Sequence, residues 1–386
     1  DHAEVTWSPE DGESQPVSAH GEIEIGDLVN GVEYTFTVKS VYRDGYATSG
    51  RIVEVAIPSL QPGELESFHL GSVQFSMHYV PEVEFPFGPY DDPTSLSAVV
   101  TGNRPSGVYE DGLVDGFFIG ETEVTYQLWD TVAVWAESNG YDWRSSYYQM
   151  GFEGEEESTV QHPVTYIGWK QAVVWCNALT EYCNAMMGTE MTCVYSRHSG
   201  AGRPYRDVAS VLYWQDVGEN PQADGFRLPT QREWELAARY IEDRDDNGSI
   251  CNLAREAYPG DFASGADAVW NETPTRDYDN DGDMDRMWDV AVIYVPSLYD
   301  AEISTGEVKS KHPNALGIYD MTGNVGEWTN TYYPYQDQIV IKGGSCTDSI
   351  SDSHLEIRSS LKRDNNYYRH DVGFRVARWP IYDWMN

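Results

Sequence analysis

The chain has 386 residues, of which 40% are hydrophobic and 13% aromatic, so it is long enough for two domains with packed cores. Its 63 acidic and 25 basic residues give a formal net charge of −38, which would repel nucleic-acid phosphates and anionic membrane surfaces. No stretch approaches the roughly 20 apolar residues of a membrane helix. We therefore expect neither nucleic-acid binding nor membrane insertion.

The first 59 residues are predicted to be all-β. Short runs of β-forming residues at 5–7, 23–25, 34–38 and 51–55 alternate with Gly, Asp and Asn turns. Residues 28–41 resemble part of a fibronectin type III or immunoglobulin-like sandwich. Because such a sandwich usually needs about 100 residues, we expect domain 1–59 to be incomplete. Residues 58–64 are the expected linker.

The second predicted domain covers 67–380 and mixes strands with helices. Strands are expected at 73–80, ended by Pro81, and at 117–120. Helices are expected at 125–137, 169–182 and 230–240, where apolar residues recur at helical spacing. Thr230 and Glu233 form a capping box at the start of the last helix. We interpret the three apolar faces as core.

The last part of this domain carries an ordered series of glycine-aromatic motifs. PNALGIYD at 313–320 is followed by GNVGEW at 323–328, KGGSC at 342–346 and GFRVAR at 373–378. These motifs frame a polar segment, 346–372, that has no apolar periodicity of its own. Loops held by a rigid scaffold are where function concentrates, so this segment is the expected functional surface.

Several motifs together resemble the formylglycine-generating enzyme (sulfatase-modifying factor) family. They are GFFIGETEVT at 116–125, HPV at 162–164, FRLPT at 226–230 and the framing motifs above. The resemblance covers about 67–378 and implies an α+β chain with the C-type lectin-like fold of this family. That fold carries both oxidases and binding proteins, so it does not decide the function.

The oxidases that this chain resembles hold copper with two cysteines placed shortly after the Gly-Gly-Ser turn. The matching positions here are Asp348 and Ser353, and neither can supply a soft thiolate. The nine histidines show no ligand spacing typical of an iron site. Enzyme activity is therefore left open but not favoured; the alternative function is an oxygen-dependent metal oxidase or sulfoxide-forming enzyme.

Two places suggest structural calcium. By resemblance to the family, Asp320 and Glu327 would supply carboxylates, and Gly323 and Val325 main-chain carbonyls, to one ion; the alternative is a turn that needs Gly323 without a metal. The acidic run is the second candidate, because its start matches an EF-hand loop, although Trp288 stands at the twelfth position; its residues are Asp277, Asp279, Asp281 and Asp283. The alternative for the run is a solvated acidic loop.

The framed segment is rich in Tyr, Ser and Asn, the residues that binding loops favour. It resembles the hypervariable segment of the target proteins of diversity-generating retroelements, which use this scaffold to bind ligands. The predicted ligand-binding residues are Cys346, Asp348, Ser349, Ser351, Asp352, His354, Asp364, Asn365, Asn366, Tyr367, Tyr368, Arg369 and His370, with Tyr332, Tyr333 and Tyr335 as neighbours. The expected partner is an unknown protein or glycan, met outside the cell, at a cell surface or on a virion. The alternative is an ordinary solvated loop.

Overall fold

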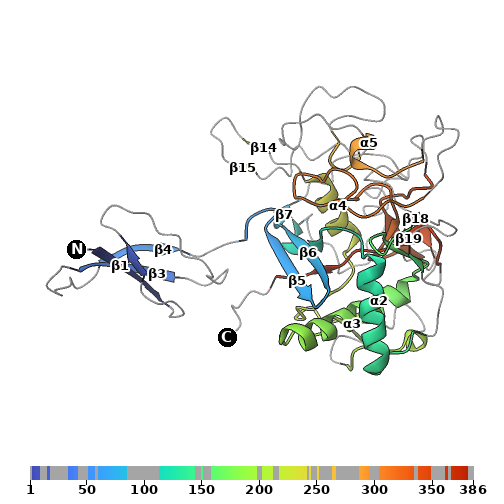
Figure 1. Cartoon of the computed structure of the whole chain (residues 1–386), viewed down its shortest axis with the longest axis horizontal. Helices are drawn as coiled ribbons and strands as arrows, with labels where there is room; N and C mark the ends of the chain where they lie inside the picture. The colour runs from blue at the N-terminus through green and yellow to red at the C-terminus, as the bar shows by residue number, and fades with distance from the viewer. Residues whose placement is uncertain are drawn as a thin grey trace. The chain divides into compact units, whose positions relative to one another are not determined.

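The chain forms two compact units, Asp1–Gln61 with Ile381–Asn386, and Pro62–Pro380 (Figure 1). The computed structural model describes residues 2–8, 15–17, 34–41, 51–56, 60–84, 113–143, 149–150, 158–197, 202–211, 217–240, 243–244, 250–251, 263–266, 287–294, 304–333, 338–348, 361–363 and 367–380.

The described part of the first unit is a single antiparallel sheet with the strand order β2-β1-β3-β4. Its strands are β1 (His2–Ser8), β2 (Gln15–Val17), β3 (Tyr34–Val41) and β4 (Arg51–Ala56). The predictions at 5–7, 34–38 and 51–55 are confirmed, and the one at 23–25 lies outside the described residues.

The second unit contains a four-stranded antiparallel sheet with the order β20-β9-β6-β5. It consists of β5 (Leu65–Leu70), β6 (Val73–Val80), β9 (Phe117–Gly120) and β20 (Ala377–Arg378), so both predicted strands, 73–80 and 117–120, are confirmed. Because Ala377 pairs with Ile119, the end of this unit returns to its first sheet.

A second sheet, with the order β18-β17-β16-β19, holds the framing motifs. Its strands are β16 (Gly326–Tyr333), β17 (Gln338–Lys342), β18 (Leu361–Arg363) and β19 (Val372–Gly373). The segment 346–372 begins after β17, contributes β18 to the same sheet and ends in β19, which runs parallel to β16 from the Gly326–Val372 pair. Both ends of the segment are thus fixed in one sheet.

Short strand pairs complete the described β-structure. They are β7 (Val83–Glu84) with β8 (Leu113–Val114), β10 (Gln149–Met150) with β11 (Val164–Thr165), β12 (Tyr195–Arg197) with β13 (Val217–Glu219), and β14 (Asp243–Arg244) with β15 (Ile250–Cys251).

The three predicted helices are confirmed with small shifts of their ends. They are α2 (Tyr126–Ser138), α3 (Trp169–Met187) and α4 (Gln231–Arg239); the structure adds α5 (Met287–Val290) and a short 3₁₀ turn, Val208–Ser210. Thr230 and Glu233 make the predicted capping box. Helix α3 runs past the predicted end at 182 because its stop signal is Gly188, whose φ of 74° suits a left-handed cap.

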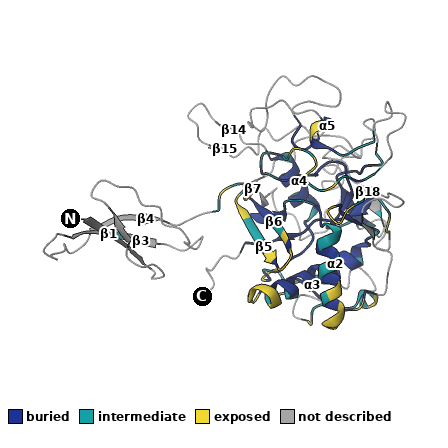
Figure 2. Cartoon of the chain, viewed as in Figure 1, coloured by how far each residue is buried: buried dark blue, intermediate teal, exposed yellow. Residues whose placement is uncertain are grey.

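The core of the second unit lies between helices and sheets, where Figure 2 shows the buried positions in dark blue. The rings of Trp129 in α2 and Trp175 in α3 stack with centroids 5.4 Å apart, and Phe374 meets both rings edge-on. All three side chains are fully buried. Within the residues that the structure describes, no helix is both long and apolar enough to span a membrane.

Candidate functional site

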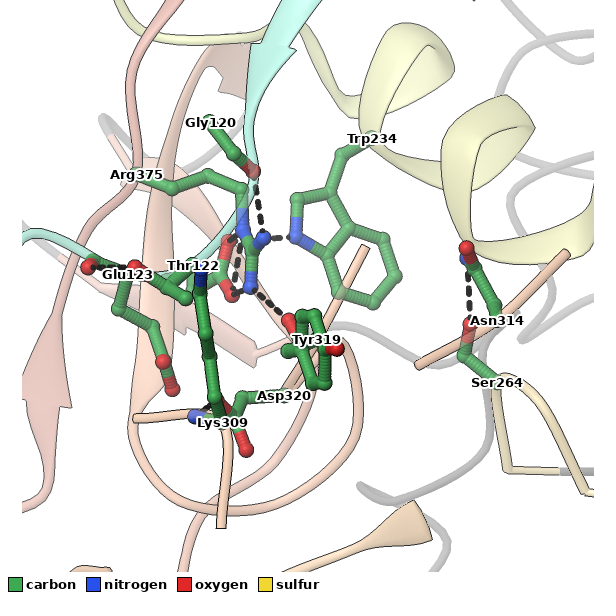
Figure 3. Close-up of polar contacts among 11 residues, drawn as sticks. Gly120, Thr122, Glu123, Trp234, Ser264, Lys309, Asn314, Tyr319, Asp320 and Arg375 are labelled. Carbon is green, nitrogen blue, oxygen red and sulfur yellow. Dashed lines mark hydrogen bonds and ion pairs between the residues drawn. The ribbon is translucent and has the colours of Figure 1, made fainter. Parts of the chain in front are cut away.

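A buried ion pair connects the framing motifs (Figure 3). The Arg375 Nε lies 2.9 and 2.8 Å from the two carboxylate oxygens of Glu327, and the Arg375 Nη2 lies 2.7 Å from Oε1. The guanidinium also donates to the carbonyls of Gly120 and Tyr319, each at 2.9 Å. The indole of Trp234 donates to the Glu327 Oε2 at 2.7 Å. These hydrogen bonds join the closing GFR motif to strand β9, to strand β16 and to Tyr319 in the turn that precedes β16.

The predicted calcium ligands do not all fit a metal equally well. Both oxygens of Glu327 already accept hydrogen bonds, and its charge is balanced by Arg375, so Glu327 has a structural role here. The Asp320 Oδ2 accepts a bond from the backbone N–H of Lys309, whereas Oδ1 is buried and has no partner among the described residues. Burial raises the pKa of Asp320 to about 6. Of the two predicted carboxylate ligands, only Asp320 has an oxygen without a hydrogen-bond partner among the described residues.

The turn between Asp320 and Glu327 needs its glycine for geometric reasons. Gly323 has a φ of 79°, and a Cβ there would meet the carbonyl oxygen of Val292 at 2.2 Å. Val325 is fully buried in the same turn. This close approach explains Gly323 whether or not a metal binds.

The acidic run that resembles an EF-hand, Asp277 to Asp283, lies outside the described residues. Across the ranges that the structure does describe, no group of three or more His, Cys, Asp or Glu side chains could hold a metal ion.

Asp348, the position that the family resemblance matches to the first copper-binding cysteine of the oxidases, carries a carboxylate that stabilises a turn. The Asp348 Oδ2 accepts hydrogen bonds from the Ser345 backbone N–H at 2.8 Å and from the Ser345 hydroxyl at 3.1 Å. The Asp348 N–H donates back to the Ser345 carbonyl at 3.1 Å. Asp348 therefore holds the entrance of the segment in shape.

The cysteine side chains that the structure describes are poor candidates for metal-binding thiolates. Cys346 is only 2% exposed, so the structure corrects its predicted position on the binding surface and places it in the core, where a thiol packs as a small hydrophobe. Burial raises the pKa of the Cys176, Cys183 and Cys193 thiols, which favours their protonated form over a metal-binding thiolate.

The end of the segment offers aromatic and basic groups at the surface. Tyr368 is 47% exposed. Tyr367 packs edge-on against Trp328 at 6.4 Å, and the guanidinium of Arg363 lies 5.0 Å from its ring centre. The exposed Arg369 pairs with Asp371 at 3.1 Å. Together with His370, which is partly exposed, these residues form the group that we call the Tyr368 surface: Arg363, Tyr367, Tyr368, Arg369 and His370.

Most of the other predicted binding residues fall outside the ranges given above. Ser349, Ser351, Asp352, His354, Asp364, Asn365 and Asn366 lie outside the described residues, as do Tyr335 and the side chain of Tyr333. Tyr332 is partly buried in β16.

Tyr166 borders the Tyr368 surface and was missed by the sequence analysis. Its backbone N–H donates to the Arg369 carbonyl at 2.9 Å, and its ring meets the His370 ring edge-on at 6.3 Å. Its φ of 58° is unusual for an aromatic residue and persists only where the surroundings fix it. The only signal in the sequence is its place directly after the HPV motif, which does not reveal its contact with 369–370.

Residues 167–169, which follow Tyr166, are hydrogen-bonded to strand β16 next to the Tyr368 surface. The Trp328 indole donates to the Ile167 carbonyl at 2.7 Å, and the Trp169 indole donates to the Thr329 carbonyl at 3.1 Å. Because Trp328 carries Tyr367, the segment 166–169 and strand β16 form a rigid base for the Tyr368 surface.

Known proteins similar in sequence to this chain include one named as a chaperone and one named as an enzyme. A chaperone protein LppX from Paenibacillus barcinonensis is 29% identical over 68% of this chain and 80% of its own length. A formylglycine-generating enzyme from Streptomyces coelicolor is 29% identical over 47% of this chain, which spans only 55% of that enzyme.

The solved structure of CarF and a family model agree with the predicted α+β, C-type lectin-like fold, which is confirmed. CarF is 25% identical, with a TM-score of 0.54 over 82% of this chain and 99% of its own. Treponema denticola variable protein 1 is also 25% identical over the same shares, with a TM-score of 0.49. The model of the sulfatase-modifying factor enzyme 1-like domain matches residues 104–380. The chain therefore belongs to the family of sulfatase-modifying factor enzyme 1-like domains.

Proposed function

We propose that this chain is a non-catalytic binding protein that recognises a protein or glycan ligand through the Tyr368 surface and Tyr166. The observation that carries the proposal is the turn at Ser345, where Asp348 stands in place of the first copper thiolate and directs its carboxylate back to Ser345. A family member without the thiol pair lacks the soft ligands that copper-dependent oxidation needs.

The composition and support of the Tyr368 surface favour binding. Tyr and Arg are enriched at the centres of protein interfaces, because they offer a large contact area and directional polar groups. Here Tyr367 packs on Trp328, whose indole is held by the Ile167 carbonyl, so little entropy is lost when a ligand orders the Tyr367 ring. The segment 346–372 contains five acidic and four basic residues, so it is much less acidic than the whole chain at −38. Repulsion of an acidic ligand would be weaker there than over the chain as a whole.

Replacing Tyr368 by alanine tests this proposal. Wild type and variants would be screened in parallel on arrays of extracellular proteins and of glycans, and the affinity for each hit would be measured by surface plasmon resonance. Because truncating a central aromatic anchor costs about 2 kcal/mol or more, we expect Tyr368→Ala to weaken binding by about 30-fold.

Val134→Ala is the matched control, since Val134 is 58% exposed on α2 and belongs to no proposed surface. It should bind as wild type does. Hits that bind Tyr368→Ala and wild type equally well, or the absence of any hit on both arrays, would count against the Tyr368 surface as the binding site.

The second candidate function is an oxygen-dependent metal oxidase. It is favoured by the similarity to a formylglycine-generating enzyme over 47% of the chain. It would need metal ligands other than the thiol pair.

A further inference from the structure

Two guanidinium groups border the side chain of Tyr367 in the Tyr368 surface. The Arg363 guanidinium lies 5.0 Å from the centre of the Tyr367 ring. The pKa of Arg369 is raised: burial alone would lower it, but the Asp371 carboxylate and a hydrogen bond with the Tyr367 side chain raise it by more. Both arginines therefore carry a fixed positive charge at this surface.

The neighbouring carboxylates face the protein more than the solvent. The Asp371 side chain is 11% exposed, whereas that of Arg369, its partner at 3.1 Å, is 46% exposed. The Asp371 Oδ2 accepts a hydrogen bond from the Thr347 hydroxyl at 3.0 Å. The Asp348 carboxylate is turned to Ser345. A ligand that approaches from the solvent therefore meets the Arg369 guanidinium before it meets these two carboxylates.

The Arg369 guanidinium has hydrogen-bond donors left for a ligand. Its Nε is the atom that pairs with the Asp371 Oδ1. A guanidinium carries five N–H donors, so the contacts with Asp371 and Tyr367 do not use them all. Its planar edge fits a carboxylate, with which it can form two parallel hydrogen bonds.

The charge of the whole chain does not prevent an acidic group from binding here. The formal net charge is −38, but salt screens charges that lie more than about 8 Å away at physiological ionic strength. A single carboxylate at the Tyr368 surface is therefore governed by the adjacent guanidinium groups. A long polyanion would also extend over acidic parts of the protein and be repelled there. These charges favour a ligand with one acidic group at the contact.

We propose that the ligand of the Tyr368 surface is a protein that places an Asp or Glu carboxylate against the Arg369 guanidinium. This inference rests on the binding function proposed above and names the class of its ligand. The exposed Tyr368 and the ring of Tyr166, which meets His370, provide apolar contact around the carboxylate. Tyrosine and arginine are typical of the central contacts of protein interfaces, and arginine clusters recognise acidic motifs of peptides.

A peptide array tests this inference. It would carry segments of extracellular proteins, each in its natural form and in a form with Asn and Gln in place of Asp and Glu. Wild type should bind acidic segments and lose them in the neutral form. Arg369→Gln should weaken binding to the same segments by about tenfold, because a charge-assisted hydrogen bond is lost. Raising the salt concentration from about 50 to about 500 mM should weaken binding by wild type and leave Arg369→Gln almost unchanged.

Arg206→Gln is the matched control for the loss of one arginine charge. Arg206 is also 46% exposed and pairs with a carboxylate, that of Glu181, outside the Tyr368 surface. This variant should bind as wild type does. Arg369→Lys keeps the positive charge, so it should retain the salt dependence even where its affinity falls. Loss of the salt dependence in Arg369→Lys would contradict the inference, because Arg369 would then act through the shape of the surface.

The outcomes separate this inference from the proposed binding function. If Tyr368→Ala loses the hits while Arg369→Gln keeps them, and neutral peptides bind as well as acidic ones, the acidic partner is overturned and the Tyr368 surface stands. Hits confined to glycans would overturn the protein partner in the same way. If Tyr368→Ala also keeps every hit, or if no array gives a hit, the proposed binding function fails together with this inference.

Discussion

Replacing Arg375 by alanine is expected to lower the free energy of unfolding by about 3–5 kcal/mol, since it leaves the Glu327 carboxylate buried without its partner. Both side chains of the pair are at most 1% exposed, so water cannot replace the guanidinium. The same change removes the links to the Gly120 and Tyr319 carbonyls. Urea unfolding followed by circular dichroism would measure the loss.

Arg206→Ala is the matched control for this experiment. Arg206 also pairs with a carboxylate, Glu181, at 2.6 Å, but its side chain is 46% exposed. Exposed pairs contribute about 1 kcal/mol at most, so this variant should remain near wild type. Combining Arg375→Met with Glu327→Gln should recover part of the loss, because the Glu327 side chain then carries no unpaired buried charge. Equal losses for Arg375→Ala and Arg206→Ala would show that the buried pair does not hold the framing motifs together.

Replacing Trp175 by alanine should cost about 3–5 kcal/mol of unfolding free energy. Trp175 is fully buried, stacks on Trp129 and meets Phe374 edge-on, and its indole donates to the Trp129 carbonyl at 3.2 Å. Its removal leaves a cavity below the GFR motif that neighbouring rigid rings cannot fill. The measurement is again urea unfolding by circular dichroism.

Trp135→Ala provides the comparison within the same helix pair. Trp135 lies on α2, is only partly buried and packs against Tyr182 at 5.3 Å. Its replacement should cost clearly less than that of Trp175. A loss of under about 1 kcal/mol for Trp175→Ala would mean that the aromatic cluster is not the core of this unit.

The parts of the fold with local signals could be predicted from the sequence. Helix α4 begins where Thr230 and Glu233 form a capping box, and strand β6 ends at Pro81, because caps and proline act through neighbouring residues. The predicted end of α3 at 182 is too early, because the apolar face continues to the buried Cys183 and the stop signal is Gly188.

The candidate site was only partly predictable because its contacts join distant segments. The GFR motif marks Arg375, but nothing in the sequence shows that its ion-pair partner is Glu327. The contact of Tyr166 with His370 likewise depends on how the two segments meet in space. Asp348 was predicted on the binding surface, but its carboxylate turns back to Ser345, which becomes visible only in three dimensions.

Copper(I) binding by the purified chain tests the central claim most directly. Affinity would be measured in competition with a chromophoric copper(I) chelator, and oxygen uptake would be followed with a thiol-containing peptide and a reductant present. Because Asp348 and Ser353 stand where the oxidases have cysteines, we expect no competition for copper(I) and oxygen uptake equal to that of the buffer with peptide. Tight copper binding together with peptide-dependent oxygen uptake would contradict the account and make this chain an oxidase.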